Sequence, residues 1–163
     1  MTIPKETPWA VLLCKFSPDL STGHPMGYSA KGNRVVFRGQ RNQICELYLG
    51  TSSWGITNLT ASTGAPAAAG DPMGYFAQVP RVVYRGQDNH IYELAIYPET
   101  GAWGLFDMTA STDAPAAVGN PMGYFAQVPR VVYRGQDNHI YELAIYPETG
   151  AWGVFDMISS ANP

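Results

Sequence analysis

Short apolar runs, separated by turns that contain glycine, proline or polar residues, make up most of the chain. The stretch 81–94, RVVYRGQDNHIYEL, shows the pattern most clearly: a run rich in Val and Tyr, a polar Gly-Gln-Asp-Asn turn and a second apolar run. Two such runs joined by a short polar turn predict an antiparallel β-hairpin. The same letters recur at 130–143, and a looser copy, RVVFRGQRNQICEL, occupies 34–47. The hairpin is therefore the unit that the chain repeats.

Each hairpin lies within a longer unit that starts with Pro-Met-Gly-Tyr. The strands predicted for the second unit are 75–78, 81–85, 90–97 and 102–108. A Pro-Glu-Thr-Gly turn precedes the fourth strand. We expect the Ala- and Pro-rich connection that follows, 109–120, to be a loop, because Pro115 lies inside it. No helical apolar periodicity is visible, so we expect an all-β protein.

The repeats divide the chain into four parts. The full units are 25–71, 72–120 and 121–163, and they follow a segment, 1–24, in which the surroundings of Trp9 resemble the end of a unit. A period of about 50 residues is typical of solenoids, propellers and arrays. Since each unit reads as four antiparallel strands, we predict a β-propeller of four-stranded blades, with three blades per chain.

Three blades do not close a ring, because propellers typically have about four to eight. An open stack would leave an apolar blade face exposed at each end. We therefore expect the ring to be closed by oligomerisation, and a homodimer with six blades is the simplest solution; a nine-bladed trimer is less usual. The strand around Trp9 either exchanges between chains or caps a sheet edge, and the sequence leaves both open.

Composition excludes several classes of partner. Charged residues make up 14% of the 163 residues and the net charge is −3, so we expect no nucleic acid to bind. No apolar run is long enough for insertion into a membrane. The N-terminus lacks the pattern of a signal peptide, so we expect a cytoplasmic protein or one released by a non-standard route. Cys14 and Cys45 are interpreted as buried thiols.

The candidate functional residues centre on a repeated Arg. In every hairpin it stands twelve positions before a Glu, and a Trp lies on the next predicted strand. These triplets are Arg34, Glu46 and Trp54; Arg81, Glu93 and Trp103; and Arg130, Glu142 and Trp152. A guanidinium offers donors in a fixed fork and a carboxylate offers acceptors, so together they can bind adjacent sugar hydroxyls. An aromatic ring packs well on the C–H face of a sugar.

With these residues the unit resembles the blade of the fungal fucose-specific lectins, six-bladed propellers of the orange peel mushroom lectin type. Their blades carry an Arg-Val-Tyr strand, a polar turn, a Glu twelve residues after the Arg, and a Trp on the following strand. The resemblance implies a multivalent, non-catalytic lectin for fucosylated glycans, with Arg and Glu from one blade and Trp from its neighbour. It would group Arg34 and Glu46 with Trp103, Arg81 and Glu93 with Trp152, and Arg130 and Glu142 with Trp54 or Trp9 of another chain.

Structural alternatives exist for each of these residues. The Arg and Glu could form an ion pair that merely ties blades together, and the Trp residues could be packing residues. The second and third units differ only at Leu105 and Val154 between the starting Pro and the last Met. This near-identity indicates recent duplication or design, so a structural or self-assembling propeller is the second hypothesis. Arg38, Arg85 and Arg134, on the same strand face, are expected to be solvated or paired with an acid such as Asp88.

Catalysis finds little support in the sequence. Nucleophile and phosphate-loop motifs are absent, and we expect no enzyme activity, no cofactor and no metal. The only candidate carboxylate pairs are Glu93 with Asp107 and Glu142 with Asp156, and the first unit has Asn58 at the Asp position. His90 and His139 are predicted to be surface strand residues. In the first unit Arg41, Gln43 and Cys45 replace Asp88, His90 and Tyr92, so its site is expected to be altered or silent.

Overall fold

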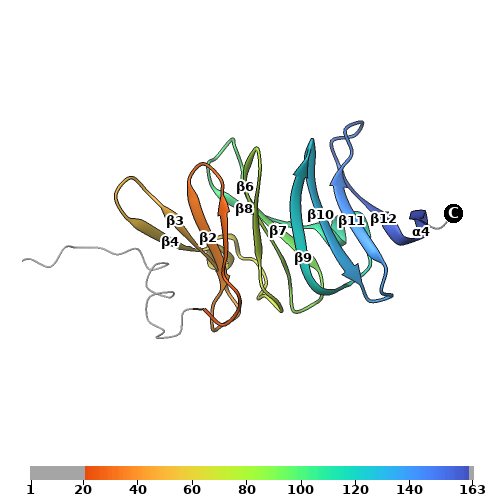
Figure 1. Cartoon of the computed structure of the whole chain (residues 1–163), viewed down its shortest axis with the longest axis horizontal. Coiled ribbons are helices and arrows are strands. Elements are labelled where there is room, and N and C mark those ends of the chain that lie inside the picture. Colours follow the sequence, from red (N-terminus) through yellow and green to blue (C-terminus); the bar gives the residue numbers. More distant parts are fainter. Residues whose placement is uncertain (1–20, 162–163) are drawn as a thin grey trace, which may run out of the picture.

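The computed structural model describes residues 21–161, and the predicted strand around Trp9 lies outside them. Three four-stranded antiparallel sheets follow one another along the chain, and we call them blades 1 to 3 (Figure 1). Blade 1 contains β1 (Met26–Ser29), β2 (Asn33–Arg38), β3 (Ile44–Leu49) and β4 (Trp54–Asn58). Blade 2 contains β5 (Met73–Ala77), β6 (Val79–Arg85), β7 (Ile91–Ile96) and β8 (Trp103–Asp107). Blade 3 contains β9 (Ala117–Ala126), β10 (Val128–Gly135), β11 (Ile140–Ile145) and β12 (Trp152–Asp156).

The prediction that the connections are loops throughout was wrong. Short helices follow the last strand of each blade: α2 (Leu59–Thr63), α3 (Met108–Thr112) and α4 (Met157–Ala161). Each of the first two starts at a side-chain cap, because Asn58 and Asp107 accept a hydrogen bond from the backbone N–H three residues on. Pro66 and Pro115 lie beyond the helix ends and do not interrupt them. A helix of five residues is too short to produce a visible apolar periodicity.

Strand β9 also starts earlier than predicted, at Ala117 and not just after Pro-Met-Gly. Its first residues pair with the end of β10, Arg134 and Gly135, beyond a break in the register. In blade 2 the same place is marked only by an isolated bridge between Ala68 and Gly86. The second half of the connecting segment therefore belongs to the following blade.

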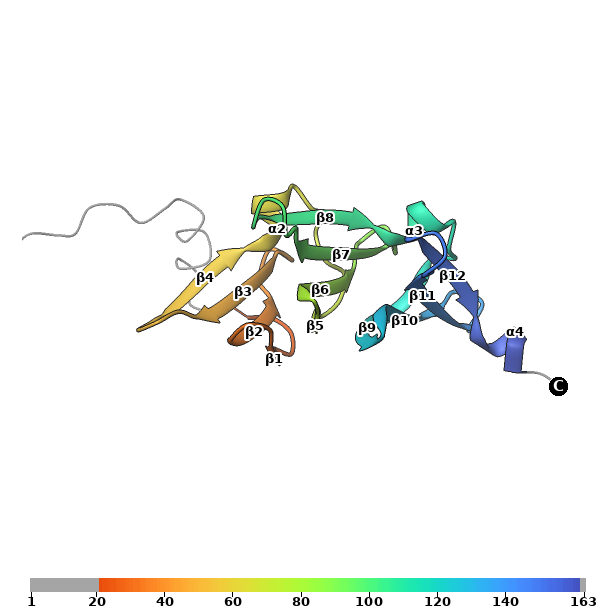
Figure 2. The ribbon, with the colours of Figure 1, turned by 90° about the horizontal axis from the view of Figure 1, so that it is seen from above.

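The blades stack face to face and fan outward, with β1, β5 and β9 on the inner side of the arc (Figure 2). The pair of valines in the repeated hairpin explains the stacking. Val82 packs with Val36 in the core between blades 1 and 2, whereas Val83 packs with Val131 in the core between blades 2 and 3. Successive strand residues point to opposite faces, so a strand buried on both faces carries an uninterrupted apolar run.

Tyrosine hydroxyls fix the connections between the blades. Tyr84 is fully buried and donates to the carbonyl of Pro66 at 2.8 Å, and Tyr133 does the same to Pro115. Both carbonyls lie in the segment that leads to the same blade as the tyrosine, so the segment is held against its strand. Cys45 is buried as predicted, and Cys14 lies outside the described residues.

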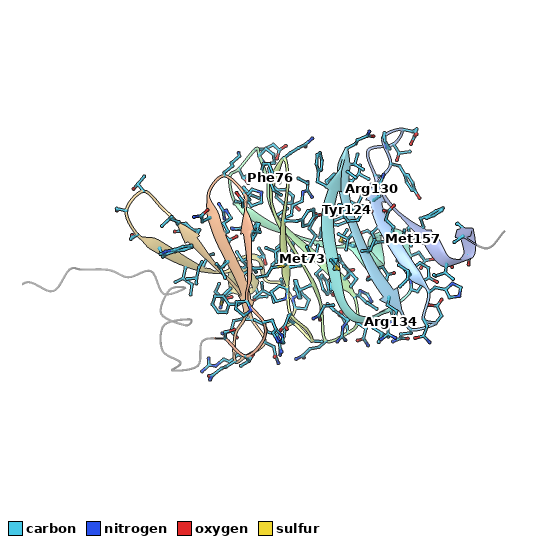
Figure 3. The ribbon with its side chains drawn as sticks, viewed as in Figure 1. Met73, Phe76, Tyr124, Arg130, Arg134 and Met157 are labelled. Carbon is cyan, nitrogen blue, oxygen red and sulfur yellow. The ribbon has the colours of Figure 1, made fainter. Side chains whose placement is uncertain are left out.

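The outward face of blade 3 is an uncovered copy of a face that blade 2 buries. Tyr75 and Met108 of blade 2 are 6% and 0% exposed beneath blade 3. Their counterparts Tyr124 and Met157 are 39% and 38% exposed, and both lie on the free side of the stack (Figure 3). The stack therefore ends on an apolar face. Among residues 21–161 no helix is long and apolar enough to cross a membrane.

Candidate functional site

In each blade the repeated Arg and the repeated Glu form an ion pair. The distances from Arg Nη1 to Glu Oε2 are 2.6 Å for Arg34–Glu46, 2.8 Å for Arg81–Glu93 and 2.6 Å for Arg130–Glu142. The register explains the contact: Arg81 lies opposite Ala95 and Val83 lies opposite Glu93, so Arg and Glu are diagonal neighbours on one face. An ion pair that bridges two blades, one of the alternatives from the sequence, is not what forms.

A tyrosine that the sequence analysis missed completes the cluster. Tyr75 donates its hydroxyl to Glu93 at 2.7 Å, and Tyr28 and Tyr124 bond to Glu46 and Glu142 in the same way. Each is the Tyr of Pro-Met-Gly-Tyr and lies opposite the Arg on the neighbouring strand. Its constant spacing of six residues before the Arg was the signal that could have identified it.

The glycine of Pro-Met-Gly-Tyr makes room for the tyrosine of the preceding blade. A Cβ on Gly74 would collide with the ring of Tyr28, and a Cβ on Gly123 would collide with the ring of Tyr75. The motif thus supplies both the hydrogen-bond donor of one cluster and the space for the donor of the previous one. This packing fixes the position of each blade relative to the next at the level of the Arg–Glu pair.

The cluster leaves hydrogen-bonding capacity for a ligand. Arg81 donates from Nε to the carbonyl of Ala77 and from Nη1 to Glu93. The other N–H groups of the guanidinium can still donate to a ligand. Glu93 accepts one bond on each oxygen, and each oxygen can accept another. Burial raises the pKa of the Glu93 carboxyl, and Arg81 and Tyr75 offset part of that effect. Burial and Glu93 raise the pKa of Tyr75 far above its usual range, so its hydroxyl donates.

A cavity of about 220 Å³ opens beside this cluster, between blades 2 and 3. It is lined by Arg81, Glu93 and Trp152, the three residues that the resemblance groups together. Phe106 and Ile145 add apolar surface, and Phe106 stacks on Trp152 with ring centroids 6.4 Å apart. The cavity therefore has a charged, hydrogen-bonding side from blade 2 and an apolar lining to which both blades contribute.

The other two clusters have different neighbours. Trp103 packs against the core between blades 1 and 2, on the side of blade 2 that meets Arg34 and Glu46. Arg130 and Glu142 face the free end of the stack, where their side chains are 31% and 12% exposed. No blade in residues 21–161 covers them, and Trp54, 51% exposed, lies at the other end of the stack. Trp9 lies outside the described residues.

The remaining candidate residues lie at the opposite end of the strands. Arg85 shares its face with Arg81, as predicted, but bonds to Asn89 and to the carbonyl of Gly119. Asp88 accepts from Tyr92, not from an arginine. In blade 3, Arg134 bonds to Asn138 and lies far along β10 from the labelled Arg130 (Figure 3). Arg38 pairs with Asp71 at 3.3 Å. This end therefore has its own set of contacts.

His90 and His139 are partly exposed, as expected of surface residues, and each also pairs with an aspartate. Their Nδ1 atoms lie 2.9 Å and 2.7 Å from Oδ2 of Asp107 and Asp156. Asp107 also caps α3, so it holds the helix, the strand end and the hairpin turn together. Because Asp107 pairs with Tyr92 and Glu93 pairs with Phe106, the two carboxylates point to opposite faces and form no pair.

The substitutions expected to alter the first site lie elsewhere. Arg41, Gln43 and Asn58 line a separate hollow of about 250 Å³ near the hairpin turn. Cys45 is adjacent to Glu46 on β3 and points to the other face. Within the described part of the chain no group of three or more His, Cys, Asp or Glu residues is placed to hold a metal ion.

Replacing Arg81 by Met tests how strongly Glu93 depends on its partner. The variant leaves a carboxylate that is 3% exposed without its cation, so we expect a loss of about 3 kcal/mol in the free energy of unfolding. Arg130→Met is the matched control; its pair is more exposed, and we expect a loss below about 1 kcal/mol. Urea unfolding of monomeric samples measures both, and equal losses would contradict the assignment.

Comparisons with known proteins attach no family to this geometry. No protein-family model matches the sequence, and no curated protein matches it significantly. The resemblance to the fungal fucose-specific lectins therefore stays a prediction from the sequence, and the function is argued from the site.

Proposed function

We propose that the protein is a multivalent, non-catalytic carbohydrate-binding protein whose sites lie between neighbouring blades. One observation carries the proposal: the cavity between blades 2 and 3 brings Arg81, Glu93 and Trp152 onto its wall. The first two offer unused donors and acceptors at fixed positions, and the third offers an aromatic surface. This is the combination that a neutral sugar requires, because a sugar has adjacent hydroxyls on one side and C–H groups on another.

The size and polarity of the cavity favour a single deoxy sugar of the fucose type. Pockets for drug-sized ligands have volumes of about 300 Å³ or more, and about 220 Å³ suits one pyranose ring. A methyl group can lie against Trp152, Phe106 and Ile145. A hydroxymethyl group there would bury a hydroxyl without a partner, at a cost of about 1–3 kcal/mol. Galactose and mannose should therefore bind more weakly than L-fucose.

We further propose that a second copy closes the ring. The outward face of blade 3 exposes Tyr124 and Met157, whose counterparts in blade 2 are buried by the next blade. Blade 1 of another chain would provide that next blade and would bring its exposed Trp54 toward Arg130 and Glu142. A homodimer would have six blades, within the usual range of about four to eight. Several sites on one ring would bind a glycan-coated surface with avidity.

A structural role for the Arg–Glu–Tyr cluster is the second candidate, and one observation favours it. The cluster in blade 3 keeps all its hydrogen bonds although no described blade covers it. Each cluster therefore joins the first three strands of its own blade without any ligand. A scaffold or self-assembling propeller would need the cluster but no sugar, so sugar binding separates the two functions.

Calorimetric titration with L-fucose tests the proposed function. Replacing Glu46, Glu93 and Glu142 by Gln keeps the shape of each site and removes its charged acceptor. We expect affinity for fucose to fall at least tenfold, since a hydrogen bond to a charged group contributes about 1.5–3 kcal/mol. The control is Arg85→Ala with Arg134→Ala at the far end of the strands, which should bind normally. No heat from the folded wild-type protein would overturn the proposal.

The pH dependence of binding follows from the state of Glu93. Its pKa is raised above the ordinary 4.5, so the carboxylate acquires a proton as the pH falls through that higher value and loses acceptor capacity. In a variant that keeps only the Arg81 site, Arg34→Ala with Arg130→Ala, we expect fucose affinity to fall on acidification with a midpoint above 4.5. Adding Glu93→Gln should abolish the transition. A midpoint below 4.5 would show that the sugar does not depend on a desolvated carboxylate.

Sedimentation analysis tests ring closure. Met157→Glu places a charge on the outward face of blade 3, so we expect the dimer to dissociate at least ten times more readily. The side chain is exposed within a single chain, so the fold should not suffer. Thr149→Glu, on the exposed outer turn of the same blade, is the control and should leave the assembly intact. A wild-type protein that is monomeric at all concentrations would contradict the closed ring.

A further inference from the structure

The residue opposite the repeated Arg distinguishes the first site from the others. Arg81 lies opposite Ala95 and Arg130 lies opposite Ala144, but Arg34 lies opposite Tyr48. Directly opposed residues on antiparallel strands point to the same face. The phenol ring of Tyr48 is therefore on the face that carries Arg34 and Glu46. None of the substitutions singled out in the sequence involves this position.

In blade 2, two cross-strand neighbours form a strip of the cavity wall. The ring of Tyr48 lies over the corresponding strip of blade 1. Ala95 and its cross-strand partner Gly104 both line the cavity beside Arg81. The partner of Tyr48 is Gly55, and a Cβ on Gly55 would collide with the tip of the Tyr48 ring. The ring thus covers both positions of the strip. An aromatic ring in van der Waals contact adds a layer of about 3.5 Å, which is enough to displace a bound sugar.

The length of the turn between the last two strands explains the change. In blade 2 the last paired residues are Ile96 and Trp103, and Tyr97 reaches back from the turn to cover Gly104. In blade 1 they are Leu49 and Trp54, so the turn is shorter and begins with Gly50. The covering tyrosine comes from two positions earlier in the strand, and it crosses the strip that Ala95 leaves open.

The apolar side of the first site is reduced as well. Phe106 lines the cavity of blade 2 and lies opposite Glu93, whereas Thr57 lies opposite Glu46. Blade 1 therefore lacks the ring that stacks on the neighbour's tryptophan in the second site. Glu46 is 1% exposed and Glu93 is 3% exposed, so the difference between the two sites lies in the side chains around the carboxylate.

We propose that Tyr48 closes the site between blades 1 and 2 to the monosaccharide that fits between blades 2 and 3. The Arg34–Glu46–Tyr28 cluster is then a structural ion pair, and ligand binding is left to the Arg81 site and to the Arg130 site once a second copy covers it. This inference rests on the proposed carbohydrate-binding function. It makes Tyr48 a specificity-determining residue for which the other two blades carry alanine.

The test isolates the first site in the full-length chain and uses L-fucose as the probe in calorimetry. Arg81→Ala with Arg130→Ala leaves only the Arg34 site, and we expect its affinity to be at least 100-fold below that of the wild type. Adding Tyr48→Ala to this background should restore binding to within about tenfold of the wild type. Tyr48 is 39% exposed, so its truncation should leave the thermal unfolding midpoint nearly unchanged.

A matched control and the outcomes separate this inference from the proposed function. Tyr97→Ala in the same double variant removes a ring of the same kind from a site that is already disabled, and it should restore nothing. Fucose binding by the double variant at wild-type affinity, abolished by Arg34→Ala, would overturn the inference alone. So would failure to restore binding with Tyr48→Ala both alone and together with Thr57→Phe. A wild-type protein that binds no fucose would overturn the proposed function and this inference with it.

Discussion

A carboxylate on the third strand of each blade constrains everything around it. Glu93 is buried on the face of blade 2 that meets the core between blades 2 and 3, where an ionised carboxyl is costly unless charge and hydrogen bonds compensate. The compensation comes from two neighbouring strands, through Arg81 and Tyr75, so the register of three strands is tied to one group. The same need fixes the glycine before each tyrosine, because the next blade must approach the ring closely. Blade geometry, blade stacking and the walls of the cavity thus follow from a single interaction.

Stacking places the repeated clusters in unequal environments. Blades 2 and 3 have almost the same sequence, yet Tyr75 is buried and Tyr124 is exposed, because only one of them has a following blade. An inter-blade site belongs to two blades at once. Its competence therefore depends on what the next blade supplies, and no property of one unit can decide it. This is why a chain with repeated clusters need not have the same number of working sites.

Much of the fold could be read from the sequence, for identifiable reasons. Burial on both faces turns the strands into continuous apolar runs, and Val82–Val83 shows that signature directly. The fixed offset between Arg81 and Glu93 matches a hairpin register that puts both side chains on one face, although the sequence analysis considered an ion pair only between blades. Tyr75 was missed although its spacing is also constant, because its contact depends on a different hairpin. The helices were missed because five residues held by a cap leave no periodic pattern, and the exposure of Arg130 depends on neighbours that the sequence does not specify.

The difference at Tyr48 would change the proposed binding site without any change in the groups that define it. Arg34, Glu46 and Tyr28 keep the same bonds as their counterparts, so a comparison of signature residues alone would call the three sites equal. The change comes from a shorter turn. Blade 1 has no residue at the position of Tyr97, so Gly55 on β4 is covered by Tyr48 of β3 instead. Covering a backbone strip is a packing requirement, and here it competes directly with the space a ligand would need. In this proposal, turn length and not the charged cluster sets the difference between the first site and the second.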